Sequence, residues 1–124
     1  MKPKIVKASS LSELQTYERC FISENFSSDV VSIARARVEP CVATVAHHLN
    51  GVDEIYLIAS GKGVVNVDGL RPVEVVEGDV IVIPAGASQR ITNTGKTDLV
   101  FYCICTPKFT TDCYCDEEAQ EKSP

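Results

Sequence analysis

Short apolar runs, each broken by turn residues after about eight to twelve positions, constrain this chain more than any other feature of its sequence. The run VVSIARARV ends at Glu39 and Pro40, and the run VIVI ends at Pro84, which cannot donate a hydrogen bond to a sheet. Asp68 and Gly69 separate VVNV from the next apolar run, as in a tight hairpin. Roughly eight or nine short strands joined by such turns predict an antiparallel β-sandwich or barrel.

The 124 residues, with a mass of 13.5 kDa, suit one domain with a single hydrophobic core. The sequence has no second composition zone and no internal repeat, and we expect three segments within it. Residues 1–17 are predicted to hold an edge strand at 2–8 and a short helix after Ser10. Residues 18–114 are predicted to form the barrel, and residues 115–124 an acidic, flexible tail.

The charge of the chain limits its partners. The formal net charge is −5, from 12 basic and 17 acidic residues, and no basic cluster occurs, so nucleic acid is not expected as a partner. No apolar run approaches the roughly 20 residues that span a bilayer, and MKPKIVKASS lacks the apolar segment of a signal peptide. We therefore expect a cytoplasmic protein without membrane contact. Open strands at both sheet edges favour pairing with a second copy, so a homodimer is expected.

The six cysteines are expected to be reduced thiols, because no secretory signal accompanies them. Cys103 and Cys105 lie two residues apart on a predicted strand, so they point to one face and cannot easily bridge each other. The pattern C-x-C, seven residues, C-x-C, which ends at Cys113 and Cys115, leaves a soft-metal site open as an alternative. We expect Cys113 and Cys115 to lie outside the core.

Two adjacent histidines and a glutamate are candidates for a metal site. His47 and His48 precede a loop, and Glu54 opens the next apolar run. An ionised glutamate at an inward strand position must be paired, hydrogen-bonded or bound to a metal, and imidazole with carboxylate suits a divalent cation. His47 shares its strand parity with Ala43 and Val45, so we prefer it as the inward ligand and keep His48 as the alternate.

The stretches AHHLNGVDEIYLIASGKG and GDVIVIPAGASQRITN together resemble the paired motifs of the cupin superfamily. The first motif is H-x-H, three or four residues, E, six residues, G, and Glu54 and Gly61 match its last two fixed positions. The second motif is G, five residues, P-x-G, two residues, H, three residues, N. Its positions are matched by Gly78, Pro84, Gly86 and Asn93. Gln89 stands where the family has histidine.

The resemblance, which covers roughly residues 18 to 114, implies an all-β, antiparallel double-stranded β-helix, the cupin or jelly-roll barrel. In the family the mouth of this barrel holds a metal on three histidines and a glutamate. With four residues between the second histidine position of the motif and Glu54, His47 takes the first histidine position and Leu49 the second. With three residues, His48 takes the first position. In both alignments one of the two histidine positions lacks a histidine. With Glu54 and Gln89 completing the set, the implied cofactor is a divalent transition metal that is weakly bound or absent.

Cupins include isomerases, epimerases, lyases and sugar-binding regulators, so the resemblance alone does not choose a reaction. The leading hypothesis is a metal-assisted isomerase, epimerase or lyase acting on a small polar sugar or carboxylate, with Glu54 as ligand or base and Tyr56 or Tyr102 as proton donors. Arg35 and Arg37 share one strand face, which is either solvated or a clamp for a substrate carboxylate or phosphate. The alternatives are a non-catalytic cupin that binds a sugar-like ligand at a degraded metal site, and a vestigial site.

Overall fold

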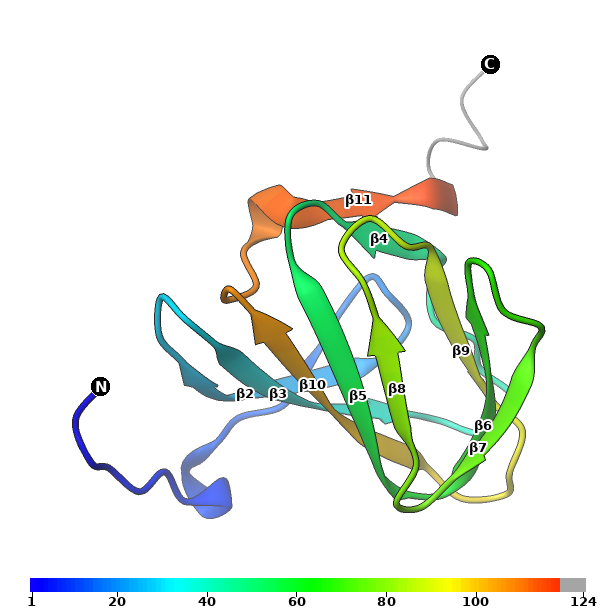
Figure 1. The fold of residues 1–124 in the computed structure, drawn as a ribbon. Coiled ribbons are helices and arrows are strands. Elements are labelled where there is room, and N and C mark those ends of the chain that lie inside the picture. The colour runs from blue at the N-terminus through cyan, green and yellow to red at the C-terminus, as the bar shows by residue number, and fades with distance from the viewer. Residues whose placement is uncertain (119–124) are drawn as a thin grey trace.

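The computed structural model describes residues 1–118 and contains two antiparallel β-sheets that face each other (Figure 1). The six-stranded sheet has the order β1 (Leu14–Gln15), β2 (Phe21–Ser27), β3 (Ser32–Val38), β10 (Leu99–Thr106), β5 (Asp53–Ser60) and β8 (Val80–Ile83). The five-stranded sheet has the order β11 (Tyr114–Asp116), β4 (His47–Leu49), β9 (Gln89–Asn93), β6 (Lys62–Val67) and β7 (Val73–Val76). The prediction of an all-β jelly-roll barrel is confirmed. No helix within residues 1–118 is long and apolar enough to cross a membrane.

Strand β5 shows how residue alternation builds the interior. Glu54, Tyr56 and Ile58 are buried, whereas Ile55 and Leu57 between them are 37% and 39% exposed. Successive side chains of a strand point to opposite faces, so the same alternation that buries Ile58 also carries a carboxyl and a phenol into the barrel. The interior is therefore apolar at one end and polar at the other.

The main core consists of inward apolar side chains from both sheets. Its fully buried members include Val38, Ile58, Ile83, Ile91, Leu99 and Phe101. A second, smaller cluster lies beside β4 and is formed by Leu49, Val52, Cys105 and Cys113, with Tyr114 packed against it. Because this cluster includes residues from the C-terminal segment, that segment is part of the packed structure.

One turn between the sheets requires glycine. Gly61 lies between β5 and β6 with a φ of +86°, in the left-handed region that L side chains rarely adopt. A Cβ at this position would stand 2.7 Å from the carbonyl oxygen of Asp98, closer than atoms can pack. The cupin-like glycine spacing therefore has a steric cause here, because the β5–β6 corner passes directly against the start of β10.

The N-terminal segment differs from its prediction. The strand expected at 2–8 does not form, and the helix predicted after Ser10 is also wrong: the 3-10 turn η1 (Ala8–Ser10) lies before it, and its last positions form the two-residue strand β1. Ile5 is 85% exposed, so the apolar residues of this segment have no neighbouring surface to cover them.

The C-terminal segment also differs. After the turn η2 (Thr111–Cys113), strand β11 pairs with β4, matching Tyr114 with Leu49 and Asp116 with His47. Figure 1 shows β11, in orange, lying across the upper end of the barrel beside β4. The domain boundary expected at residue 115 therefore cuts through a paired strand, and residues 119–124 of the expected tail lie outside the described residues.

Candidate functional site

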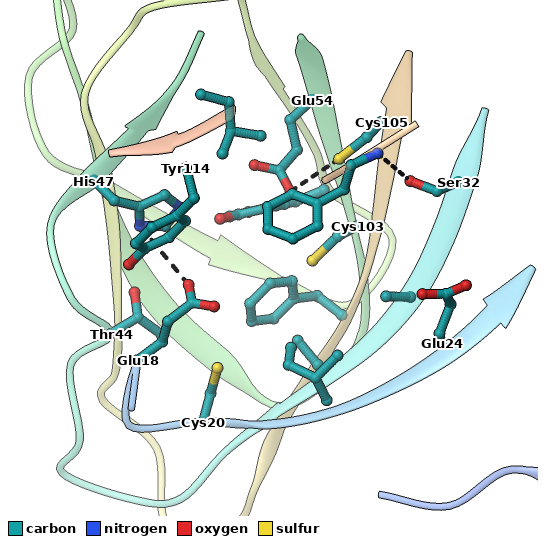
Figure 2. A pocket seen from close by; sticks show the side chains of 17 residues that line it. Glu18, Cys20, Glu24, Ser32, Thr44, His47, Glu54, Cys103, Cys105 and Tyr114 are labelled. Carbon is teal, nitrogen blue, oxygen red and sulfur yellow. Dashed lines mark hydrogen bonds and ion pairs between the residues drawn. The ribbon is translucent and has the colours of Figure 1, made fainter. Parts of the chain in front are cut away.

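A cavity of about 180 Å³ lies between the two sheets near the end covered by β11. Figure 2 shows carboxyl, imidazole, phenol and thiol groups turned toward it from several strands. Its polar lining consists of Glu18, Glu24, Ser32, Thr44, His47, Glu54, Tyr56, Cys20, Cys103, Cys105 and Tyr114. No lysine or arginine is among the lining residues of the described chain. The cavity therefore combines acidic groups with apolar walls.

His47 is the imidazole of this cavity. It is 5% exposed, and β4 places it opposite Gln89 of β9. Its Nδ1 lies 2.7 Å from the carbonyl oxygen of Val45, which can only accept, so Nδ1 carries the proton. Burial lowers the pKa of His47, and the ring is therefore neutral near pH 7, with an unprotonated Nε2. His48 does not line the cavity, and its Nδ1 lies 3.0 Å from Oε2 of Glu117.

Glu54 is buried with an incomplete set of partners. The residue is 6% exposed, and Cys105 donates its thiol to Oε2 over 3.5 Å. Its Oε1 has no hydrogen-bond partner among the described residues. Burial raises the pKa of Glu54, an effect that the nearby Gln89 amide and the thiols of Cys105 and Cys103 only partly offset. Burial therefore disfavours the ionised form of this carboxyl relative to an exposed glutamate.

Gln89 and Tyr56 are joined to each other. The Tyr56 hydroxyl donates to Oε1 of Gln89, and burial raises the pKa of Tyr56 well above its ordinary value. Gln89 is 1% exposed, and its Nε2 does not reach hydrogen-bonding geometry with any described residue, although it lies close enough to Glu54 to lower the pKa of that carboxyl. The structure therefore brings together four residues expected from the sequence: His47, Glu54, Tyr56 and Gln89.

Glu18 is a site residue that the sequence did not indicate. Its Oε2 lies 4.0 Å from Nδ1 of His47, as the dashed line in Figure 2 marks. Burial, followed by the nearby charges of Glu54 and Asp116, raises the pKa of Glu18 to about 7. The residue precedes β2 in an irregular segment without a motif, so only the folded chain reveals its place.

Tyr114 and Phe109 form an aromatic wall from the C-terminal segment. The Tyr114 ring stacks on His47 with centroids 4.7 Å apart and an interplanar angle of 25°. Phe109 lies near Tyr114, and its backbone N–H donates to Ser32 Oγ over 2.9 Å. The sequence carries little signal for this wall, because Phe109 and Tyr114 lie in the last part of the predicted barrel segment, in no motif, beside an acidic tail that was expected to be flexible.

Besides His48, three residues expected at the site do not line the cavity. Arg35 and Arg37 lie on the outer face of β3, where Arg37 is 2.7 Å from Glu13 and 3.2 Å from Asp98. Arg35 is 3.5 Å from the same glutamate. The inward positions of β3 belong to Ser32, Ala34 and Ala36, so no guanidinium clamp forms. Tyr102 pairs with Arg35 across the sheet and does not line the cavity, so it is not placed to donate a proton there.

The cavity residues do not fit a transition-metal site. Within residues 1–118, no three His, Cys, Asp or Glu side chains are grouped so that they could hold an ion. Leu49 lines the cavity where a second histidine would be needed, and the amide oxygen of Gln89 already accepts from Tyr56. One neutral imidazole beside a carboxyl that favours protonation is a poor ligand set for a divalent cation.

Comparison with known proteins places the chain among relatives of similar architecture. Residues 34–105 match the family described as "Cupin domain". An oxalate-binding protein of Thermotoga maritima is 38% identical over 71 residues, which are 57% of this chain and 58% of that protein, so the match spans less than two thirds of its length.

Solved structures extend the match over more of the chain. The structure of a predicted oxalate decarboxylase from Thermotoga maritima has a TM-score of 0.77 and 26% identity, covering 84% of this chain and 99% of that one. KdgF from Halomonas sp. has a TM-score of 0.80 with 12% identity, covering 90% of this chain and 98% of that one, and shows the fold alone.

Proposed function

Because this chain belongs to the cupin family, we propose that its barrel binds a small polar molecule and transfers protons on it, in a reaction of the isomerase or lyase class that needs no metal. The membership supports a small-molecule site, and the side chains of the cavity support the reaction class. The metal-assisted form expected from the sequence is set aside, because the residues present do not fit the ion.

The single observation that carries the proposal is the pairing of an unprotonated base with a protonatable acid in one cavity. His47 keeps its proton on Nδ1 through Val45, so Nε2 is free to accept one. Glu54 is a buried carboxyl whose raised pKa favours the acid form. Titratable groups whose environments shift one pKa down and the other up suit general acid–base catalysis.

The chemistry follows from these two states. Nε2 of His47 takes a proton from a carbon next to a substrate carbonyl, while Glu54 gives its proton to the carbonyl oxygen, and an enol forms. In the isomerisation of a hydroxy-ketone the intermediate is an enediol: His47 returns its proton to the former carbonyl carbon, while the hydroxyl on the neighbouring carbon gives its proton to Glu54 and becomes the new carbonyl. In an elimination, a leaving group on the next carbon departs with the proton from His47, and the enol hydroxyl returns its proton to Glu54 as the carbonyl re-forms. In this mechanism Glu54 polarises the carbonyl, a role that was expected of a metal ion from the sequence.

The acidic lining argues against carrying over the ligand of the oxalate-binding relative. A doubly charged oxalate would meet Glu18, Glu24 and Glu54, with no lysine or arginine among the described lining residues to pair with it. The same reasoning disfavours the carboxylate substrates expected from the sequence and leaves uncharged polar groups or cations.

A second candidate function is ligand binding without catalysis, the alternative expected from the sequence. It is favoured by the bond between Tyr56 and Gln89, which holds both polar groups in a fixed arrangement with no part in proton transfer. Deuterium exchange into a bound compound distinguishes catalysis from ligand binding alone.

Deuterium incorporation tests the proposal without knowledge of the natural substrate. Protein treated with EDTA is incubated in D2O with a panel of small hydroxy-ketones and amino-ketones, and exchange of their carbon-bound protons is followed by NMR. The wild type is expected to accelerate exchange on at least one compound, and His47→Gln and Glu54→Gln to lose that acceleration by about a hundredfold or more. Tyr102→Phe, on the outer face, is the matched control and is expected to retain it.

Other outcomes of this experiment would contradict the proposed proton transfer. Exchange that survives in His47→Gln, or that requires added Mn²⁺, would remove the metal-independent mechanism. Saturable binding of a panel member without any exchange would favour the non-catalytic function.

A further inference from the structure

The cavity contains a buried carboxyl oxygen that reaches hydrogen-bonding geometry with no partner in residues 1–118, although the Gln89 amide lies near its carboxyl. Oε1 of Glu54 has no hydrogen-bond partner among the described residues, although the residue is only 6% exposed. Figure 2 shows the Glu54 carboxyl turned inward, toward the space enclosed by the other labelled side chains. A buried acceptor without a partner destabilises the empty protein, and a ligand that donates to it removes that penalty.

The charges around the cavity are of one sign. Glu18, Glu24 and Glu54 all line it, and the Glu54 charge is one of the causes that raise the pKa of Glu18. His47, the only potential cation in the lining, is held neutral by burial. Burial raises the pKa of both Glu18 and Glu54, and a positive charge placed between these two carboxyls would stabilise their ionised forms.

The rest of the wall is aromatic and apolar. Phe101, Phe109 and Tyr114 contribute rings, and Ile22 and Ala36 contribute aliphatic surface. Aromatic faces attract an organic cation through the ring quadrupole and also cover the alkyl part of such a molecule. A bare divalent ion would gain nothing from these walls, and the described residues offer it no group of three ligands.

We propose that the cavity binds a small organic ammonium ion between Glu18 and Glu54, with the charge of the ion balanced by Glu18. The inference rests on the proposed function only in placing the substrate in this same cavity, and it names the charge class of that substrate. With about 180 Å³ available, the ligand is a small amine bearing a short alkyl or carbonyl-containing chain.

Binding is coupled to proton release. Five titratable groups lie near Glu18. They are Glu54 on β5, His47 on β4, Tyr114 and Asp116 on β11, and Cys20 immediately before β2. When the ammonium ion enters, a carboxyl that was protonated loses its proton to solvent and forms the ion pair. Since the pKa of Glu18 is about 7, affinity for an ammonium ion is expected to rise roughly tenfold between about pH 6 and pH 8.

The test uses three molecules of nearly equal size and different charge. Isopentylamine, isopentanol and isovalerate are titrated into EDTA-treated full-length protein by calorimetry, in two buffers of different ionisation enthalpy. The amine is expected to bind at least about tenfold more tightly than the alcohol near pH 8, and isovalerate most weakly. The heat of amine binding is expected to differ between the buffers, which reports the released proton.

Variants connect the charge preference to the cavity. Glu18→Gln is expected to abolish the pH dependence, and Glu54→Gln to reduce the preference for amine over alcohol by about tenfold. Glu74→Gln, at an exposed position of β7 away from the cavity, is the matched control and is expected to change neither. Should either cavity variant fail to fold, the pH dependence and proton release of the wild type still decide the matter.

Several outcomes would overturn the proposal. Equal affinity for isopentylamine and isopentanol near pH 8 would assign the cavity to uncharged ligands, and tighter binding of isovalerate would assign it to anions. Stoichiometric binding of Mn²⁺ or Ni²⁺ that is lost in Glu54→Gln would assign it to a metal. No binding of any probe would also refute it. Each of these results can coexist with deuterium exchange on a ketone, so the charge class can fail while the proposed function stands.

Discussion

Position 89 decides which ligands the cavity can hold. Gln89 faces His47 across the β4–β9 pair, where the cupin motif has a histidine, and Leu49 lies two residues beyond His47 on the same face of β4. Both side chains are almost fully buried, with exposures of 1% and 2%. An amide engaged by Tyr56 and an aliphatic group in these places leave the cavity without two of the four expected metal ligands.

Restoring both imidazoles should create a metal site. Gln89→His combined with Leu49→His is expected to raise the affinity for Ni²⁺ by roughly a hundredfold or more, as measured by titration after EDTA treatment and dialysis. Arg90→His, on the exposed side of β9, is the control and should leave the weak binding of the wild type unchanged. Wild-type protein that kept stoichiometric metal through chelation, or a double variant that bound none, would contradict this geometry.

Glu18 is expected to make stability depend on pH. Its pKa is about 7 in the folded protein against 4.5 for the free side chain, so the folded state binds the proton more tightly than the unfolded state. The free energy of unfolding should therefore fall as pH rises from about 4.5 to 7 and stay level above that range. Glu18→Gln, which mimics the protonated form, should equal the wild type near pH 4.5.

Well above pH 7 the free energy of unfolding of the variant should exceed that of the wild type by roughly 3 kcal/mol. Urea unfolding at a series of pH values, expressed as the difference between the two proteins, measures this effect apart from other titrating groups. A difference that stayed constant over the whole range would show that Glu18 is not desolvated as described.

The residues of the site divide by how they reach the cavity. His47, Glu54 and Gln89 were predicted because motif spacing and strand alternation fix their positions locally. Glu18 and Tyr114 were not predicted, because they meet His47 only through tertiary contacts between distant segments. Arg37 failed as a candidate for a physical reason visible in the sequence: on its strand, the face opposite the arginines carries small residues suited to a barrel interior.

Among the elements, β11 changes the interpretation of the C-terminal segment most. Alternation and turn residues predicted strands such as β3, β5 and the β6–β7 hairpin, and the structure contains them. The acidic composition of the C-terminal segment predicted a flexible tail and gave no indication of the short strand β11. This strand forms by pairing with β4, a contact between segments that are distant in the sequence. Glu117 and Glu118 strengthen the attachment through His48 and Arg19, so the acidic residues that suggested a solvated tail are used as anchors.

The two cysteines of this segment should therefore behave differently, contrary to the expectation that both lie outside the core. Cys113 is 7% exposed and packs with Leu49, Val52 and Cys105. Cys113→Ser is expected to lower the free energy of unfolding by about 1–2 kcal/mol, because a hydroxyl replaces a thiol in an apolar cluster. Cys115→Ser should change it by less than about half of that.

Thermal unfolding under reducing conditions provides the comparison, with each variant measured beside the wild type. Equal melting temperatures for all three proteins would mean that the C-terminal segment contributes little to stability.

At the scale of the whole molecule, the outer face of the six-stranded sheet has an exposed apolar patch. Ile55 and Leu57 of β5 lie beside Val80 and Val82 of β8, and the two valines are 56% and 64% exposed. Strand β8 is also the last strand of this sheet, so its outer edge has no neighbour within residues 1–118. Apolar surface next to an open edge favours association with a second copy.

We predict a homodimer that uses this patch. Light scattering at tens of micromolar should give twice the 13.5 kDa of one chain, and Val82→Lys should shift the equilibrium toward the monomer. Val73→Lys, at an exposed position of the other sheet, serves as the control and should leave the mass unchanged. A wild-type mass near 13.5 kDa would contradict the prediction.

The stacking of Tyr114 on His47 also has a consequence for biosynthesis. Every strand of both sheets except β11 precedes Tyr114 in the sequence, so the ribosome releases them first, and a domain can begin to fold as it emerges. The imidazole then stays without its stacking partner until residues 107–118 leave the exit tunnel. A nascent chain stalled before that point would hold most of the barrel but would lack the aromatic wall that Tyr114 and Phe109 add to the cavity.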